Sequence, residues 1–188
     1  MIWTRTRTRS RTRTKSRLLA FASLLLSCSL QSPATEIRGA LAAATPLEVP
    51  AGSARITLSR AAFHDVEVAA EGGRARVLAV VDADGRVELD GRQVALGYIG
   101  REAFEMERCA RARWCPAGSP LPALAGVVAA LAAAPRDGWR WPVAWQIRVE
   151  RERATVGEDA EGFGGVKPRR GAYDLVRDGA AWRLAGPR

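Results

Sequence analysis

The chain has 188 residues and a formal net charge of +9, a length that suits one domain or two small ones. Seven of its 29 bases lie in residues 1–27, where there is no acid, so the remainder holds 22 bases against 20 acids. The high charge therefore belongs to the first segment and does not indicate a nucleic-acid-binding body. A hydrophobic fraction of 47% and a charged fraction of 26% exclude global disorder.

The first segment joins a basic arm to an apolar run. Thr and Arg alternate up to Arg17, and residues 18–30 then form an apolar run of 13 residues. A basic region followed by about 7–15 apolar residues is typical of a secretory signal peptide. The run is shorter than the roughly 20 residues that a membrane-spanning helix needs. We therefore predict a signal peptide over residues 1–27; the alternative is a basic tail followed by a buried helix.

Leu25-Leu26-Ser27-Cys28 lies within this run and resembles the lipobox of bacterial lipoprotein precursors. The resemblance covers four residues and implies cleavage before Cys28 and lipidation of its thiol, which would anchor the chain in a membrane. In that family Ser29 would favour the outer membrane, so the chain is expected at its periplasmic face. The alternative is later cleavage, for example after Ala34, which gives a soluble periplasmic or secreted protein.

The other two cysteines, Cys109 and Cys115, are expected to form a disulfide. An exported chain meets an oxidising compartment, where a leftover pair of thiols is expected to bond. Their spacing is not the Cys-x-x-Cys of a redox motif, and two thiols with one distant histidine are too few ligands for a zinc site. We predict a structural bond, no metal and no cofactor.

Residues 28–51 mix Ala, Pro, Ser and Thr without a pattern and are expected to form a flexible tether. One globular domain over residues 52–188 would follow. It opens with a predicted β meander whose strands alternate apolar and polar residues between Gly-containing turns. The predicted strands are 55–60, 64–70, 74–81, 86–90 and 92–96, with a turn at 82–85.

Two helices are predicted next. Ile99, Ala103, Met106 and Ala110 recur at a helical spacing, which favours a helix over 99–110. Residues 121–134 carry no charge, follow Ser119-Pro120 and end before Pro135, so they predict a buried crossover helix.

The C-terminal part is predicted to be strands. Residues 139–156 alternate so regularly that they predict one long strand, with an edge or bulge at Pro142. Its predicted inner face carries Trp139, Trp141, Val143, Trp145, Ile147 and Val149. A glycine-rich loop over 157–171 and a hairpin around Asp178-Gly179 complete the chain. The predicted class is α+β, with helices packed on one face of an antiparallel sheet.

The residues give little indication of catalysis. His64 is the only imidazole, and its place on an apolar strand favours a structural role. The carboxylate pairs Asp82/Asp84 and Glu150/Glu152 are explained by a turn and by a solvated strand face. We therefore predict that the protein is not an enzyme.

Tryptophan and arginine dominate protein-binding hot spots, and both are available here. The candidate partner-binding residues are Trp114, Trp139, Arg140, Trp141, Lys167, Arg169 and Arg170. The expected function is that of an envelope lipoprotein that binds an envelope or exported protein, as an accessory subunit, an inhibitor or an immunity-type protein. The alternatives are a small periplasmic hydrolase, an apolar-ligand carrier with a pocket between helix and sheet, and a cell-wall polymer binder. Nucleic acid is not an expected partner.

Overall fold

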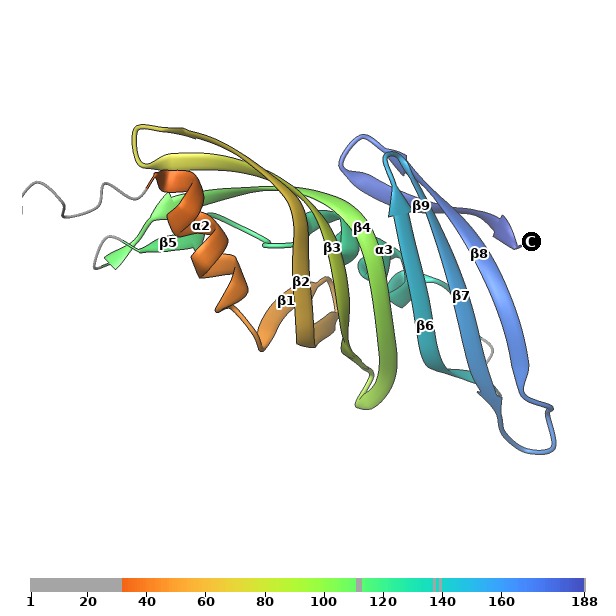
Figure 1. Ribbon diagram of the computed structural model, residues 1–188. Coiled ribbons are helices and arrows are strands. Elements are labelled where there is room, and N and C mark those ends of the chain that lie inside the picture. The colour runs from red at the N-terminus through yellow and green to blue at the C-terminus, as the bar shows by residue number, and fades with distance from the viewer. Residues whose placement is uncertain (1–31, 111–112, 137, 139, 188) are drawn as a thin grey trace, which may run out of the picture. The chain divides into compact units, whose positions relative to one another are not determined.

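The computed structural model describes residues 32–110, 113–136, 138 and 140–187. Within them nine strands form one curved sheet, and two helices pack against it (Figure 1). The helices are α2 (Pro33–Ala42) and α3 (Pro122–Ala133). The strands are β1 (Leu47–Ala51), β2 (Ala54–Glu71), β3 (Arg74–Leu89), β4 (Arg92–Arg108), β5 (Trp114–Pro116), β6 (Arg140–Glu150), β7 (Arg153–Gly162), β8 (Arg169–Asp178) and β9 (Ala181–Pro187). No helix of these residues is long and apolar enough to span a bilayer.

The sheet is mixed, so the predicted α+β fold with an antiparallel sheet is wrong. The strand order is β1-β2-β3-β4-β6-β7-β8-β9, with β5 beside the end of β4. The β4–β6 pair is parallel and every other pair is antiparallel. Parallel neighbours need a crossover connection, and α3 lies within the connection from β4 to β6. The sequence did predict this crossover helix, but not the direction of the strand that follows it.

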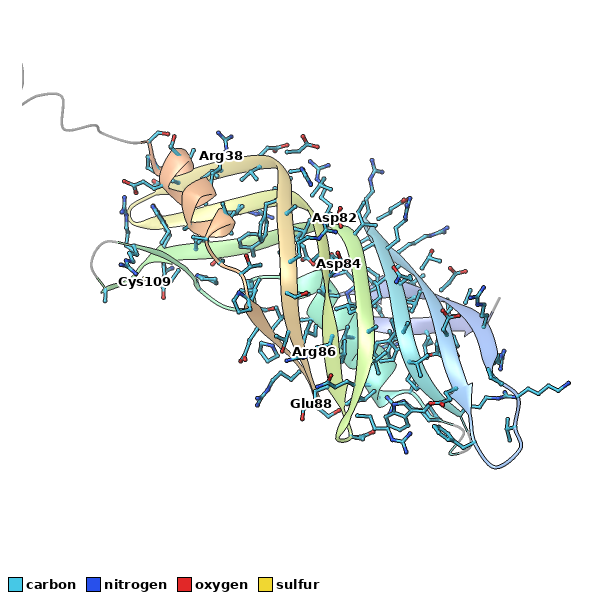
Figure 2. All side chains as sticks on the ribbon, turned by 60° about the horizontal axis from the view of Figure 1, so that its bottom comes forward. Arg38, Asp82, Asp84, Arg86, Glu88 and Cys109 are labelled. Atoms are coloured by element: carbon cyan, nitrogen blue, oxygen red, sulfur yellow. A yellow bond between two sulfur atoms is a disulfide. The ribbon has the colours of Figure 1, made fainter. Side chains whose placement is uncertain are left out.

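Both helices lie on one face of the sheet, here called the inner face. Alternate residues of β3 are buried on it: Ala75 and Val77 belong to a cluster with Ile37 of α2, whereas Val81 belongs to a cluster with Leu124 of α3. The outer face of β3 carries charged side chains, of which Asp82, Asp84, Arg86 and Glu88 are labelled in Figure 2. The sheet is therefore apolar on one side and solvated on the other.

The helix predicted over 99–110 is wrong, because residues 92–108 are the strand β4. Its alternation is hard to see in the sequence, since a glycine and an acid occupy two inner positions. The buried side is formed by Tyr98, Gly100, Glu102, Phe104 and Met106. Glu102 is 0% exposed. A charged residue in a sequence is normally expected to face solvent, so this burial could not be predicted.

The turn predicted at 82–85 is also wrong, because β3 runs without a break from Arg74 to Leu89. Gly85 is instead a point of close backbone approach. A Cβ at this position would collide with the carbonyl oxygen of Thr57 and lie 2.8 Å from the Cα of Leu58. The β2 strand has two bulges, between Leu58 and Arg60 and between His64 and Glu67, and the first lies beside this point. A glycine inside a strand thus indicates a bulge here rather than a turn.

The tether predicted over 28–51 differs from the structure over its described part. Residues 33–42 form α2, in which Ile37 is 0% exposed and Leu41 is 5% exposed. Residues 47–51 form β1, where Val49 lies opposite Ile56 of β2 and both are buried. The folded unit therefore begins at Pro33 and not at residue 52. The large apolar residues of the 33–51 segment are few and lie widely spaced among alanines and prolines, so the sequence does not predict that this segment packs on the sheet.

The C-terminal strands agree with the sequence in part. The hairpin around Asp178-Gly179 is confirmed as the β8–β9 turn. The single strand predicted over 139–156 is instead two strands, β6 and β7, joined by a turn in which Arg151 has a φ of 53°. The glycine-rich loop is shorter than predicted and covers only residues 163–168. The bulge predicted at Pro142 is present between Pro142 and Ala144. It reverses the alternation, so Val143 is 41% exposed although Trp145 is buried as expected.

Candidate functional site

Five of the predicted partner-binding residues lie at one end of the sheet. Ala160 of β7 pairs with Pro142 on one side and with Arg169 on the other, and Asp159 pairs with Arg170. This register places the start of β6, with Arg140 and Trp141, close to the start of β8. Lys167 lies in the connection just before β8. Cys28 and Trp139 lie outside the described residues.

Trp114 is not at that end and is not displayed to solvent. It is 7% exposed and belongs to the cluster around Ile37. Its indole Nε1 donates to the Glu36 carboxylate at 2.9 Å, and the Arg108 guanidinium lies 4.6 Å from its ring centre. Trp114 therefore holds α2 against the sheet. The Cys109–Cys115 disulfide is present beside it, as predicted.

The residues considered for catalysis lie on solvated surfaces. His64 is exposed on β2. Arg60 donates to Asp84 at 2.8 Å and lies 3.6 Å from Asp82, so this carboxylate pair forms ion pairs on the outer face. No group of three or more His, Cys, Asp or Glu side chains among the described residues is placed to hold a metal ion.

Arginines stack on the aromatic rings at the shared end of β6, β7 and β8. The Arg92 guanidinium lies 4.8 Å from the ring centre of Trp141 and 5.1 Å from that of Phe163. The Arg136 guanidinium also lies over Trp141, 5.4 Å from its ring centre. Such contacts contribute about 0.5–2 kcal/mol each and hold the rings in place. We call these four residues the aromatic–arginine cluster. The sequence predicted Trp141 only, because the partners come from distant parts of the chain.

Exposed bases border this cluster. Lys167, Arg169 and Arg170 are exposed, and Arg170 lies 2.9 Å from Asp159. Lys167 and Arg169 form no ion pair with any residue that the structure describes. The border of the cluster therefore carries positive charge that faces solvent.

A pocket of about 290 Å³ opens on the inner face at this end of the sheet, and we call it the Glu158 pocket. The end of α3 and strands β6 to β9 form its walls. It is lined by Leu131, Ala134, Pro135, Arg136, Arg140, Trp145, Glu158, Ala160, Arg169, Tyr173 and Leu184. This is the kind of place, between helix and sheet, that the sequence suggested for a ligand.

The Glu158 carboxylate is fixed by two aromatic donors. The indole Nε1 of Trp145 donates to one oxygen at 2.8 Å, and the hydroxyl of Tyr173 donates to the other at 3.0 Å. Burial, followed by the charge of Glu158 and the hydrogen bond to it, raises the pKa of Tyr173. The charges of Arg169 and Arg140 act in the opposite direction on this pKa, so both guanidiniums lie within electrostatic reach of the pair.

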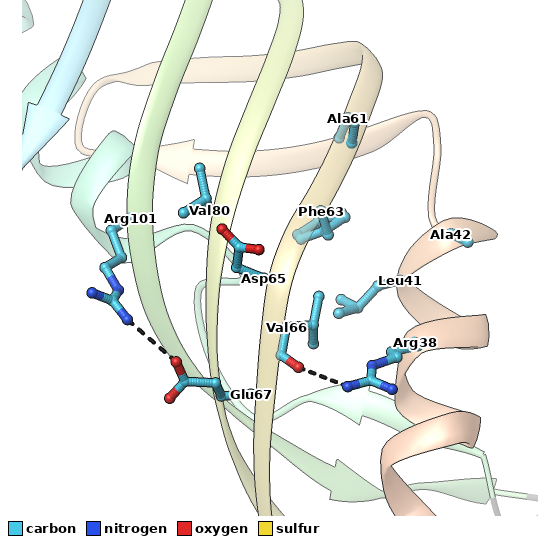
Figure 3. A pocket seen from close by; sticks show the side chains of 11 residues that line it. Arg38, Leu41, Ala42, Ala61, Phe63, Asp65, Val66, Glu67, Val80 and Arg101 are labelled. Atoms are coloured by element: carbon cyan, nitrogen blue, oxygen red, sulfur yellow. Dashed lines mark hydrogen bonds and ion pairs between the residues drawn. The ribbon is translucent and has the colours of Figure 1, made fainter.

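A larger and more open cavity, about 990 Å³, lies between α2 and the second bulge of β2 (Figure 3). Its arginines are engaged with the protein. Arg38 donates to the carbonyl of Val66 at 2.9 Å, and Arg101 lies 3.4 Å from Glu67 (Figure 3). Arg38 thereby covers a carbonyl of β2 beyond the reach of β1, where no described strand pairs with that edge of β2.

Comparisons with known proteins give no family. No family model matches the chain, and no curated protein matches it. Among solved structures, it is similar to an NTF2-like protein involved in plasmid conjugation, with 8% identity over 71% of this chain and 78% of that one and a TM-score of 0.25. It is also similar to a glycoside hydrolase, with 17% identity over 79% of this chain and 44% of that one and a TM-score of 0.18.

Proposed function

We propose that this chain is an exported envelope lipoprotein whose domain is a non-enzymatic module that binds an acidic protein partner. Export and lipidation rest on the sequence of residues 1–28. Partner binding rests on one observation, the convergence of the aromatic–arginine cluster and its basic border at one end of the sheet. An accessory subunit, an inhibitor and an immunity-type protein would all use such a surface.

The cluster has the chemistry of a binding hot spot. Trp and Arg are enriched among residues that dominate binding energies, and Arg92, which stacks on the rings of Trp141 and Phe163, keeps its in-plane N–H donors available for carboxylates. The indole Nε1 of Trp141 is buried without a hydrogen-bond partner. Lys167 and Arg169 would speed the approach of an acidic surface.

Replacing Trp141 by alanine is expected to weaken partner binding by at least about tenfold, because it removes the ring on which both arginines stack. The measurement is affinity capture from detergent-solubilised envelope with the full chain as bait. One protein should be retained by the wild type, and reduced with W141A and with Lys167→Glu.

Arg86→Glu is the matched control for this capture, because Arg86 is an exposed arginine on the outer face of β3. It changes the charge of the bait as Lys167→Glu does but leaves the proposed surface intact. The captured protein should remain with R86E and be released as the salt concentration rises. Equal capture by all four baits would contradict the proposed surface.

The anchor has its own test. Cys28→Ala is expected to abolish incorporation of labelled palmitate and to release the protein from the membrane fraction, because the acyl chains supply its membrane affinity. Fractionation of cells that express the full chain measures both effects, with Cys109→Ala/Cys115→Ala as the control for loss of thiols elsewhere. Unchanged membrane retention of C28A would exclude the anchor and leave the partner-binding surface untested by this result.

A further inference from the structure

We propose that the Glu158 pocket binds a small organic monocarboxylate with an apolar body. This is a second binding site, and the argument for it does not depend on the protein partner. It rests on two cationic side chains without partners, one fixed carboxylate and an apolar wall, all within one small cavity.

The first step is the unpaired positive charge. Arg140 and Arg169 both line the pocket, and neither forms an ion pair with any described residue. The Nε of Arg140 is also buried without a hydrogen-bond partner. A buried donor left in this state is costly, whereas a carboxylate accepts in-plane hydrogen bonds from a guanidinium with good geometry. The pocket therefore favours an anion at this wall.

Arg136 contributes shape rather than free charge. It donates to the carbonyls of Leu131 and Ala132 at 3.2 and 2.9 Å, at the C-terminal end of α3, and lies 3.0 Å from Asp90. Its charge is thus already used on the helix end, where a cation is favoured. The ligand charge is determined by the remaining groups of the pocket.

Glu158 limits the ligand to one negative charge. Two unpaired guanidiniums face one carboxylate, so the pocket holds a single excess positive charge. Trp145 and Tyr173 hold Glu158 in place, so it cannot turn away from a ligand. A second negative group on the ligand would meet the charge of Glu158 in a partly desolvated site, where like charges repel strongly.

The rest of the wall is apolar and close. Leu131, Pro135 and Leu184 line the pocket, and Leu184 is 40% exposed although it is a large apolar residue. The volume of about 290 Å³ lies just below the range of pockets for drug-sized ligands, about 300–1,000 Å³, which suits a smaller ligand. A short aliphatic chain would cover Leu184 and fill this space. The larger cavity beside α2 offers no comparable site, because both of its arginines are engaged.

The test uses three probes of matched length and isothermal titration calorimetry of the full chain at neutral pH. Hexanoate is expected to bind saturably, with a dissociation constant in the millimolar range or below. Adipate, which adds a second carboxylate, should bind roughly tenfold more weakly, and 1-hexanol should not bind measurably. Adipate binding as tightly as hexanoate, or 1-hexanol binding equally well, would overturn the proposed selectivity.

Arg140→Gln removes the charge and should weaken hexanoate binding roughly tenfold. Arg148→Gln is the matched control, because Arg148 lies on the same strand with an exposed side chain on the outer face, and it should leave the affinity unchanged. Glu158→Gln removes the negative charge that repels the second carboxylate, so it should reduce the difference in affinity between hexanoate and adipate. A thermal melt of each variant reports folding separately from binding.

Absence of saturable binding by hexanoate, or equal affinity in R140Q and R148Q, would exclude the pocket as a monocarboxylate site. Trp141→Ala separates this proposal from the proposed function, because Trp141 does not line the pocket. W141A should lose the protein partner and retain hexanoate. Each proposal can therefore fail without the other.

Discussion

Replacement of Glu102 by alanine is expected to lower the free energy of unfolding by about 3–5 kcal/mol, because it removes the acceptor of three hydrogen bonds, each of which costs about 1–3 kcal/mol when a buried donor is left unpaired. The side chain is 0% exposed and accepts three hydrogen bonds. One oxygen accepts from the Tyr98 hydroxyl at 2.6 Å and from the Leu124 amide at 2.9 Å, and the other accepts from the Ala123 amide at 2.9 Å. Alanine would leave all three donors without this acceptor, and two of them, the Tyr98 hydroxyl and the Leu124 amide, are buried.

The two amides belong to the first turn of α3, whose N–H groups have no partner within the helix. The cap residue of this helix is Leu121, which makes no side-chain hydrogen bond to it. Glu102 therefore does from a strand what a Ser or Asp does from the cap position. Its loss would affect both the helix end and the attachment of α3 to β4.

Urea denaturation of the full chain measures this effect. Glu105→Ala is the control, because Glu105 lies on the same strand with an exposed side chain, and it should change the stability by less than about 0.5 kcal/mol. Equal stabilities of E102A and E105A would contradict the role assigned to Glu102.

The same experiment has a pH arm. Burial raises the pKa of Glu102 above its ordinary value of 4.5, despite its three hydrogen bonds and the charge of Arg177. The unfolded chain therefore releases this proton at a lower pH than the folded protein does. The wild type should lose stability relative to Glu102→Gln as the pH rises from 4.5 through the raised pKa. A parallel pH dependence of the two proteins would contradict this linkage.

Replacement of Trp182 by alanine is expected to cost about 3–5 kcal/mol, as for other large-to-small changes in a core. Trp182 is 7% exposed and lies on β9, which pairs only with β8 among the described strands. Its indole rests on Gly126 of α3 so closely that a Cβ there would lie 2.5 Å from Cδ1. The glycine and the indole together join the last strand to the helix.

Thermal and urea denaturation of W182A give the measurement, and Leu184→Ala on the same strand is the control. Leu184 is 40% exposed, so its truncation should cost less than about 1 kcal/mol. Trp182→Phe should recover part of the lost stability, because it restores an aromatic ring against Gly126. If W182A were no less stable than L184A, β9 would not depend on this contact.

The elements that the sequence predicted correctly are those with local causes. The helix α3 has an uncharged run between Pro120 and Pro135, and the β8–β9 hairpin has Asp178-Gly179 at its turn. The first part of β4 was predicted as a strand over 92–96, but its second part was missed because its period of two depends on burying Glu102, and this burial depends on the helix α3. The helix α2 was missed because its apolar residues Ile37 and Leu41 are buried only through packing against the sheet, which the local sequence does not reveal.

The same distinction applies to the candidate site. Arg140, Trp141, Lys167, Arg169 and Arg170 could be selected from residue type and composition, and strand pairing brings them together. Arg92, Phe163 and Glu158 could not be selected in this way, because their roles follow from the register of β4, β6, β7 and β8. The burial of Trp114 could not be predicted from residue type, because it depends on the contact of Trp114 with Glu36 of α2.

The sequential order of the sheet has a consequence for how the chain folds. Along the sheet each strand pairs with the strand that precedes it in the chain, except that β6 pairs with β4. Only this β4–β6 step spans a helix. During synthesis, which starts at the N-terminus, each new strand can therefore pair with the edge of the sheet that has already formed. Most pairings thus join strands that follow one another in the chain, which lowers the sequence separation of the contacts relative to a sheet built from crossovers and leaves fewer edges unpaired while the sheet grows.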